Sequence, residues 1–343
     1  MNIGTIYYLV PDIFKSKFSL RWYLREVRRG RGIAFLKSCV RNHKKAIGGI
    51  KIFYQHVKYL RELGYDAHVL ALGSFDGNVY YPDITAKKVR DVGFALNAND
   101  IVVATEFCPY DGLKFSNCLK VVFVQSWIYI NEKKHDNDKD KSYRELGFDY
   151  VISCSEYISK LIEELNFEDC VTVQNGVDTK VFYPEPNLRE VNRILCLPRK
   201  NRDDIERIRE IVSERVPQAN FVEVDGVSES VIAKEYRRAD IFLATGYPEG
   251  FGLPSIEAIQ SGCVVVGFHG QGGAEFLINE DTALISKDGD YEGAAENMIK
   301  VLNDPELKER IRQCSQAIVK KYTCDAMKQR IGDFYQDVDR DME

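Results

Sequence analysis

The chain has 343 residues, a length that corresponds to about two domains of ordinary size. Hydrophobic residues make up 45% and charged residues 29%, which is a globular composition and excludes a disordered chain. The net charge of −5 provides no general basic surface, so we expect no nucleic-acid partner.

Nine scattered cysteines include no Cys-x-x-Cys pair, so the sequence contains no zinc or redox motif of that kind. Their odd number fits reduced thiols in a cytoplasm. The first ten residues lack the basic start and cleavage site of a signal peptide. No apolar run reaches the roughly 18 residues that a membrane span needs. We therefore expect a cytoplasmic protein.

Short apolar runs rich in β-branched and aromatic residues alternate with longer helical patterns along the chain. The first series of expected strands covers residues 3–10, 67–72, 101–105, 120–125, 150–153 and 171–174. The second series covers residues 193–197, 221–224, 241–245, 264–268 and 283–286. Nearly continuous hydrophobic strands are typical of parallel sheets covered on both faces, and the helices between them supply the crossovers.

Residues 49–63 illustrate such a crossover helix. One face carries apolar residues at helical spacing, and a glycine follows the expected end: Ile50, Phe53, Val57, Leu60 and Gly64.

Two series of five or six strands predict an α/β fold with two doubly wound, Rossmann-like domains rather than one large sheet. Two prolines at 184 and 186 exclude helix and interior strand there, so we place the boundary after residue 184. The expected domains are 1–184, with an insertion at 13–47, and 185–321. Residues 322–343 are expected to form a carboxy-terminal helix that packs back on the amino-terminal domain.

The most informative stretch runs from Tyr247 to Glu257 and follows the expected strand 241–245. Ligands of open α/β sheets gather at the carboxyl ends of strands, where this loop is expected to lie. Gly250 and Gly252 let backbone N–H groups approach a ligand closely, and the start of the following helix favours an anion such as a diphosphate. Glu249 and Glu257 are suited to accept hydrogen bonds from sugar or ribose hydroxyls.

This stretch resembles the GT-B glycosyltransferases, in particular the retaining family 4, which carries two glutamates eight positions apart around a Gly-Phe-Gly-Leu-Pro loop. The resemblance implies two Rossmann-like domains that face a cleft, with Glu249 on the donor sugar hydroxyls and Glu257 on the ribose. It also implies a donor role for Gly250, Phe251, Gly252 and Leu253.

Three further segments resemble the family in the same order. Residues 174–178 are similar to its domain connection, and residues 270–275, with Gly272 and Gly273, to its glycine-rich loop. Gly48 and Gly49 are similar to the loop of the amino-terminal domain at the cleft, on the acceptor side.

A transferase of this kind must stabilise a departing nucleotide diphosphate. Arg199 and Lys200 follow the expected strand 193–197, where the family places its basic phosphate clamp. The local sequence departs from the family's commoner Gly-Arg…Lys-Gly motif. Which of the two side chains reaches the phosphate is therefore left open. Such preorganised charge is usually the largest catalytic contribution.

Catalysis by this family needs no general base, because the donor phosphate can accept the proton of the acceptor. Glu106, at the end of the expected strand 101–105, is a candidate acceptor-side residue, and a structural carboxylate is an equal alternative. His269 lies beside the glycine-rich loop, and we favour a structural role for it. We expect neither a metal ion nor another cofactor.

Residues 13–47 carry eleven Lys or Arg residues and one acid, Glu26. On a helix, Arg21, Arg25 and Arg28 would share one face opposite an apolar one. This pattern is compatible with an anionic membrane surface or a lipid-diphosphate acceptor, and equally with an ordinary solvated basic face.

The sequence therefore predicts a metal-independent retaining glycosyltransferase that uses a nucleotide-sugar donor and a glycan or lipid-linked acceptor. The resemblance implies bacterial polysaccharide or glycan biosynthesis, in the cytoplasm or peripheral to the inner face of the membrane. Two alternatives stay open: a catalytically silent GT-B subunit that binds glycan or a partner, and a nucleotide-sugar epimerase of the same fold. The donor base, sugar, acceptor, linkage and oligomeric state are not predicted.

Overall fold

Two parallel β-sheets organise the chain in a computed structural model that describes residues 2–10, 48–73, 81–166 and 169–343. The basic segment 13–47, for which membrane contact is predicted, lies outside the described residues. Among the described residues, no helix is long and apolar enough to cross a membrane.

The first sheet has seven strands in the order β3-β2-β1-β4-β5-β6-β7. Its strands are β1 (Thr5–Val10), β2 (Asp66–Ala71), β3 (Lys87–Lys88), β4 (Ile101–Thr105), β5 (Leu119–Val124), β6 (Tyr150–Ser153) and β7 (Val171–Thr172). Helices and one 3-10 turn connect them: α3 (Gly48–Glu62), α4 (Val89–Val92), α5 (Pro109–Gly112), α6 (Tyr129–Glu132), η2 (Asp136–Asp138), α7 (Tyr143–Leu146) and α8 (Glu156–Asn166).

The second sheet has five strands in the order β12-β11-β10-β8-β9. They are β8 (Arg193–Cys196), β9 (Asn220–Glu223), β10 (Ile241–Ala244), β11 (Val264–Phe268) and β12 (Leu284–Ser286). The helices that follow or connect them are α9 (Arg202–Arg215), α10 (Glu229–Arg238), α11 (Leu253–Gln260), α12 (Tyr291–Asn303), α13 (Pro305–Ile318) and α14 (Cys324–Asp341). Two 3-10 turns, η3 (Pro186–Leu188) and η4 (Val319–Tyr322), complete the described elements.

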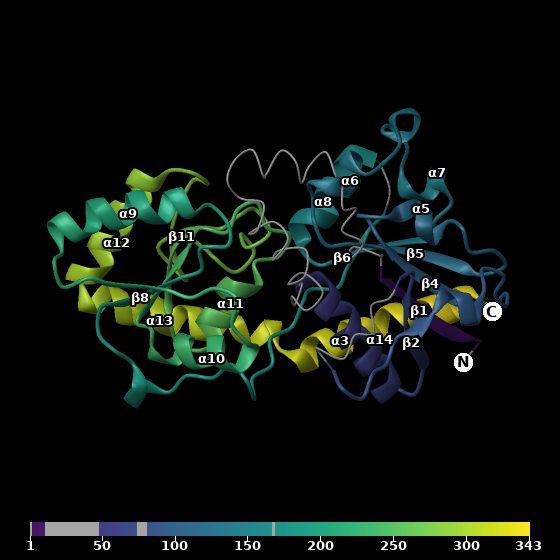
Figure 1. Cartoon of the computed structure of the whole chain (residues 1–343), viewed down its shortest axis with the longest axis horizontal. Helices are drawn as coiled ribbons and strands as arrows, with labels where there is room; N and C mark the ends of the chain where they lie inside the picture. Colours follow the sequence, from purple (N-terminus) through teal and green to yellow (C-terminus); the bar gives the residue numbers. More distant parts are fainter. Residues whose placement is uncertain (1, 11–47, 74–80, 167–168) are drawn as a thin grey trace, which may run out of the picture. The chain divides into compact units, whose positions relative to one another are not determined.

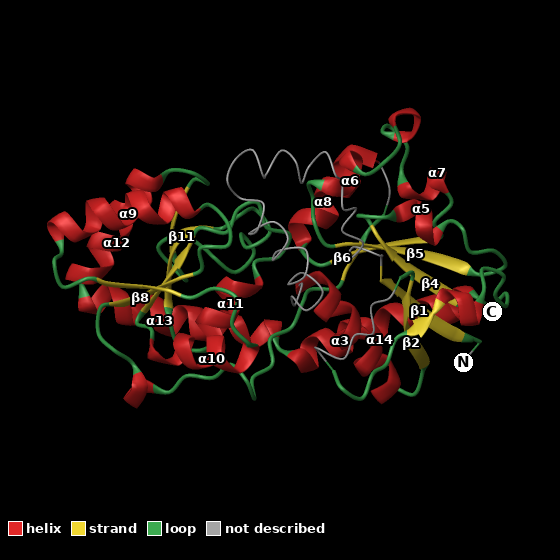
Figure 2. Cartoon of the chain, viewed as in Figure 1, coloured by secondary structure: helices red, strands yellow, loops and turns green. Residues whose placement is uncertain are grey.

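Helices cover both faces of the second sheet (Figures 1 and 2). Helices α9 and α12 pack together on one face, and α10, α11 and α13 lie on the other. The core between the sheet and α9 and α12 contains Leu243, Ile208 and Met298. This double cover explains why the strands are continuous hydrophobic runs, and it confirms the predicted α/β fold with doubly wound parallel sheets.

Helix α3 has the predicted amphipathic pattern. Its apolar face, which includes Phe53, Val57 and Leu60, is buried. Gly64 follows the helix with a φ of +92°, a left-handed conformation that favours glycine.

Contacts divide the chain into two units that differ from the predicted domains. The first unit is Met1–Phe123, Lys133–Val151 and Ile331–Glu343, and the second is Val124–Glu132 and Ile152–Arg330. Residues 152–184 therefore group with the second unit. Val177 N donates to Tyr322 O at 2.8 Å, and the Phe182 ring packs on Tyr236 at 6.1 Å. A pair of prolines marks where regular structure stops, whereas these contacts decide how the chain divides.

The last part of α14 belongs to the first unit and packs near α3, β1 and β2 (Figure 1). The Tyr335 hydroxyl lies 3.1 Å from the Tyr8 hydroxyl of β1, and Asp339 Oδ1 accepts a hydrogen bond from Ile3 N at 3.0 Å. The Tyr8 hydroxyl also lies 2.9 Å from His56 Nδ1 of α3. A buried polar chain thus connects three elements that are distant in sequence.

Burial in this chain lowers the pKa of His56 to about 3. Its Nε2 atom is buried and has no hydrogen-bond partner among the described residues. Because the folded protein keeps the ring neutral while the unfolded chain protonates it below about pH 6.5, the ring destabilises the fold as the pH falls from that value towards 3.

We expect a His56→Asn variant to lose less stability than the wild type between pH 7 and pH 5, by about 2 kcal/mol. Asn retains a polar atom near the Tyr8 hydroxyl but cannot ionise. The free energy of unfolding, measured by denaturant titration at both pH values, checks this difference. Identical pH dependence in the two proteins would show that His56 is not held neutral.

Candidate functional site

The candidate site lies in the second unit at the point where the strand order reverses. The chain runs from β8 outward to β9 and then returns to β10 on the other side of β8. Since β8, β10, β11 and β12 are parallel, the loops after them meet at one edge of the sheet. All the predicted donor-side residues follow β8, β10 or β11.

Two of these residues meet directly. Lys200 Nζ donates to Glu249 Oε1 at 2.9 Å and to the carbonyl oxygen of Pro248 at 2.7 Å. Both side chains keep partial solvent exposure, 35% for Lys200 and 20% for Glu249. An ion pair this exposed contributes little to stability, but it holds the carboxylate and the ammonium side by side where a ligand can reach them.

Arg199 has a different environment. Its side chain is exposed, and it forms no ion pair with any described residue. The two neighbouring cations therefore differ. Lys200 forms an ion pair with Glu249, whereas the guanidinium of Arg199 is exposed to solvent and has no acidic partner among the described residues.

Asn201 connects the loop after β8 to the loop after β10 by hydrogen bonds at the strand-order reversal. Its Nδ2 donates to the carbonyl oxygens of Thr245, at 2.8 Å, and Tyr247, at 2.7 Å. It precedes α9 with a φ of +49°, a left-handed conformation that asparagine tolerates well. The sequence analysis missed this residue, although an asparagine just before a helix start is a recognisable signal.

The glycine-rich loop after β11 pairs with the loop after β10 through backbone groups. Glu249 N donates to Gly270 O at 2.9 Å, and Gly272 N donates to Glu249 O at 3.2 Å. A Cβ on Gly272 would lie 2.1 Å from Gly250 O, and one on Gly250 would lie 1.8 Å from Gln125 O. Only glycine allows backbones to approach this closely, so Gly272 is required by the packing of the two loops and Gly250 by the approach of the backbone just after β5.

Other predicted residues of the loop have defined places. Gly252 precedes α11 with a φ of +92°, and Leu253 is the first residue of this helix. The Phe251 ring is buried against Phe276 and Tyr322, which leaves only the Phe251 backbone available to a ligand. Gly273 N donates to His269 O at 3.0 Å.

Glu257 is the fifth residue of α11 and lies near Tyr236 of α10. Burial raises the pKa of the Tyr236 hydroxyl, and the charge of Glu257 raises it further. The two glutamates of the motif occupy different surroundings, since Glu249 lies on a loop beside Lys200 and Glu257 lies on a helix.

Two further residues fix the glycine-rich loop. His269 Nδ1 accepts a hydrogen bond from Gln271 N at 2.9 Å, which supports the structural role favoured for this histidine. Asp288, just after β12, accepts from Gly270 N at 3.1 Å and from Gln271 Nε2 at 3.3 Å. The sequence analysis missed Asp288, whose only local signal is its place in a turn directly after a strand.

The acceptor-side candidates lie in the first unit. Glu106 follows β4, is 3% exposed, and accepts a hydrogen bond from Thr105 Oγ1 at 2.5 Å. Gly48 and Gly49 are the first two residues of α3, and Gly48 is exposed. The burial of Glu106 leaves its catalytic and structural interpretations both open.

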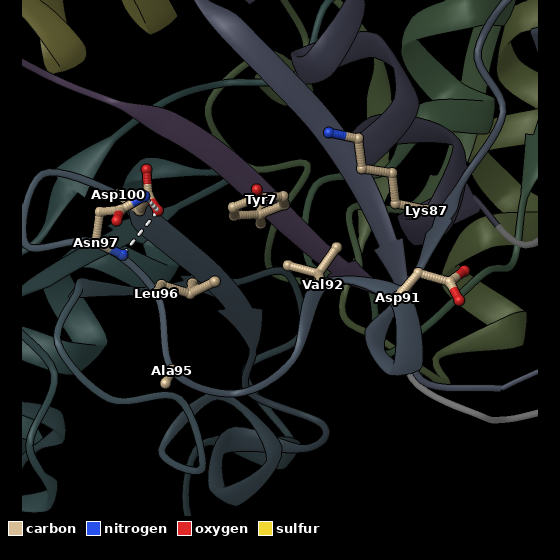
Figure 3. Close-up of a pocket in the computed structure, with 8 residues that line it drawn as sticks. All are labelled: Tyr7, Lys87, Asp91, Val92, Ala95, Leu96, Asn97 and Asp100. Atoms are coloured by element: carbon tan, nitrogen blue, oxygen red, sulfur yellow. Dashed lines mark hydrogen bonds between the residues drawn. The ribbon is translucent and has the colours of Figure 1, made fainter.

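A hollow of 540 Å³ in the first unit contains none of the predicted residues. Tyr7, Lys87 and Asp100 are among the residues that line it (Figure 3). The Asp100 carboxylate is used by backbone groups, since it accepts from Thr5 N at 2.8 Å and from Asn97 N at 3.0 Å. We therefore do not assign a reaction to this hollow.

Metal ligation has no support in the described part of the chain, where no group of three or more His, Cys, Asp or Glu side chains could hold an ion. The expected metal independence stays a prediction. The eight cysteines in the described part are free thiols.

Residues 201–317 match the family model "Glycosyl transferases group 1", which confirms the predicted resemblance to this group. An α-1,6-glucosyltransferase of Actinobacillus pleuropneumoniae is 22% identical over 247 residues, which are 66% of this chain and 71% of that protein. The capsular polysaccharide biosynthesis glycosyltransferase CapM of Staphylococcus aureus is 32% identical over 92 residues, covering 27% of this chain and 24% of CapM.

The structure of Anabaena HepE, solved in complex with UDP and glucose, is similar with a TM-score of 0.69. The likeness covers 97% of this chain and 100% of HepE at 12% sequence identity. At this identity the likeness concerns the fold, and it confirms the predicted GT-B fold class.

We expect Gly272→Ala to destabilise the protein by about 1–3 kcal/mol, because the added methyl group meets backbone atoms of Gly250 and Phe251 rather than a side chain that can move. Thermal unfolding measures the loss. Gly332→Ala in α14 is the control: its Cβ would meet only the Leu63 side chain, at 3.3 Å, and we expect a change within about 1 kcal/mol. Equal melting temperatures for both variants would contradict the tight packing of the two loops.

Proposed function

We propose that this chain, whose residues 201–317 match the group 1 glycosyl transferases, moves a sugar from a nucleotide-sugar donor to an acceptor hydroxyl with retention at the anomeric carbon. The observation that carries the proposal is the meeting of Lys200 and Glu249 at the strand-order reversal, beside the start of α11. A cation, a carboxylate and a helix amino terminus side by side match the diphosphate and the hydroxyls of such a donor.

Each part of the donor has a proposed partner. Lys200 and the exposed Arg199 bind the diphosphate, with help from the positive end of α11. Glu249 accepts hydrogen bonds from sugar hydroxyls, and Glu257 from the ribose. The backbone of Gly250, Phe251, Gly252, Leu253, Gly272 and Gly273 lies close to the donor.

In the reaction, the bond between the anomeric carbon and the donor phosphate breaks, and a bond from that carbon to the acceptor oxygen forms on the same face. The acceptor proton passes to an oxygen of the departing diphosphate, so no separate base is required. Lys200 and Arg199 stabilise the negative charge that grows on the diphosphate, and this stabilisation is the main catalytic contribution of the chain. We propose that no metal ion takes part.

The acceptor side is proposed for the first unit, which contains Glu106, Gly48 and Gly49. The donor side is proposed for the second unit. The names of the relatives support a hexose donor and a role in bacterial polysaccharide or glycan assembly. Contact of residues 13–47 with the inner face of a membrane, and a cytoplasmic location, belong to the same proposal and rest on the sequence.

Binding of UDP-, GDP-, ADP- and dTDP-glucose to the purified protein tests the proposal by thermal shift and by slow donor hydrolysis. We expect one of them to raise the melting temperature and to be hydrolysed. Lys200→Met should then slow hydrolysis about 10²- to 10³-fold, because the departing diphosphate loses a cation in a preorganised site. Glu249→Gln should weaken binding of the nucleotide sugar more than binding of the free nucleoside diphosphate.

Lys300→Met provides a matched control, since Lys300 forms an ion pair with Glu280 at 3.1 Å away from the proposed donor residues. It should retain wild-type hydrolysis. If no nucleotide sugar binds, the silent-subunit alternative replaces our proposal. If a changed sugar is released without an acceptor, the epimerase alternative does.

A further inference from the structure

Glu275 closes the glycine-rich loop after β11. Its Oε2 atom accepts a hydrogen bond from the backbone N of Glu156 at 2.9 Å. Glu156 is the first residue of α8, an eleven-residue helix, so the carboxylate lies at the positive end of this helix. Both residues belong to the second unit.

The surroundings of the carboxyl group are unusual for an acid. Its Oε1 atom is buried and has no hydrogen-bond partner among the described residues. Burial raises the pKa of Glu275 to about 7, and the charge of Glu156 adds to the effect. The hydrogen bond from Glu156 N and the cations Arg330 of α14 and Lys160 of α8 act in the opposite direction.

Tyr322 is the remaining titratable group beside Glu275. Its hydroxyl lies 3.4 Å from the Glu275 backbone oxygen. Burial, followed by the charge of Glu275, raises the pKa of this hydroxyl, so Tyr322 stays neutral near pH 7.

Short backbone hydrogen bonds connect Glu275 to the candidate donor site. Ala274 N donates to Gln271 O at 3.0 Å, which closes the turn that precedes Glu275. In the same loop, Gly270 O and Gly272 N bond to the backbone N and O of Glu249. The segment is therefore fixed at one end by the Glu275 carboxylate and holds the backbone of Glu249 at the other.

We infer that Glu275 is a positioning residue of the donor site, which anchors the glycine-rich loop to the start of α8 and so holds Glu249 in place for the donor. This role rests on the proposed function. Burial in the anchored loop disfavours the charged carboxylate more than the hydrogen bond and the nearby cations favour it. The neutral carboxyl group therefore favours the anchored loop over an arrangement that exposes the group to water, and loss of the proton loosens the loop.

Two measurable properties then decrease together as the pH rises. The folded protein takes up a proton at Glu275 near pH 7, whereas the unfolded chain does so near 4.5. The raised pKa favours the folded state at low pH, and this contribution is lost as the pH rises from about 4.5 to 7. Donor binding requires the anchored loop, so it weakens as the pH rises through 7.

The test measures the affinity for whichever of UDP-, GDP-, ADP- or dTDP-glucose binds the wild type, between pH 5.5 and 8.5. These diphosphodiesters have no group that titrates in this window, so the pH dependence comes from the protein. With a pKa of about 7, only about a tenth of Glu275 is neutral at pH 8, and we expect about tenfold weaker binding there than at pH 6.

Glu275→Gln preserves the shape and an acceptor oxygen but removes the charge. Because Gln resembles the neutral carboxyl group, we expect this variant to bind the donor more tightly than the wild type at pH 8 and with no pH dependence between pH 6 and 8. Glu280→Gln, an exposed acid nearby in sequence, should keep the wild-type profile. A Gln variant that keeps the tenfold change, or that binds like the wild type at pH 8, overturns the inference.

Thermal unfolding without ligand separates this inference from the proposed function. The melting temperature of the wild type relative to Glu275→Gln should fall as the pH rises from 5.5 to 8. A constant difference overturns the proposed titration of Glu275, whatever the donor does. If the difference follows the expected course but no nucleotide sugar binds at any pH, the proposed function fails, and the donor-positioning role fails with it.

Discussion

The close approach of two loop backbones, the one after β10 and the one after β11, is the constraint on which the candidate site depends. Glu249 exchanges backbone hydrogen bonds with Gly270 and Gly272, and no side chain fits between the loops at Gly272. The carboxylate of Glu249 is therefore presented from a backbone that is held on both sides. A ligand that binds it meets a preorganised group rather than a loop that must first be ordered.

Three ion pairs of the second unit illustrate how burial distinguishes a structural contact from a candidate binding site. Asp240 is buried and bonds to Lys308 and Arg312 of α13, each at 2.7 Å, so it docks this helix. The pair of Lys200 and Glu249 is only partly covered and adds little stability. Charged side chains that meet at strand ends without a structural need are suited to a charged ligand.

One cause, the loss of water around a charge, shifts two buried groups in opposite directions. It lowers the pKa of His56 to about 3 and raises that of Glu275 to about 7, because in each case the neutral form is favoured. In the folded protein His56 stays neutral well above pH 3, so its effect is on stability alone. Glu275 titrates near pH 7, and its loop bonds to the backbone of Glu249.

The sequence by itself determined most strands to within one or two residues, since continuous apolar runs bounded by turns depend on local chemistry. It also determined that Lys200, Glu249 and the glycine-rich loop follow strands of one parallel sheet. The two-residue strand β3 escaped prediction because Lys87 and Lys88 are polar. Tertiary structure alone decided which cation meets Glu249, how residues 152–184 group, and that Asn201, Asp288 and Glu275 hold the loops. These features arise from contacts between residues far apart in the chain, and burial, which sets the pKa of Glu275, exists only once those contacts form.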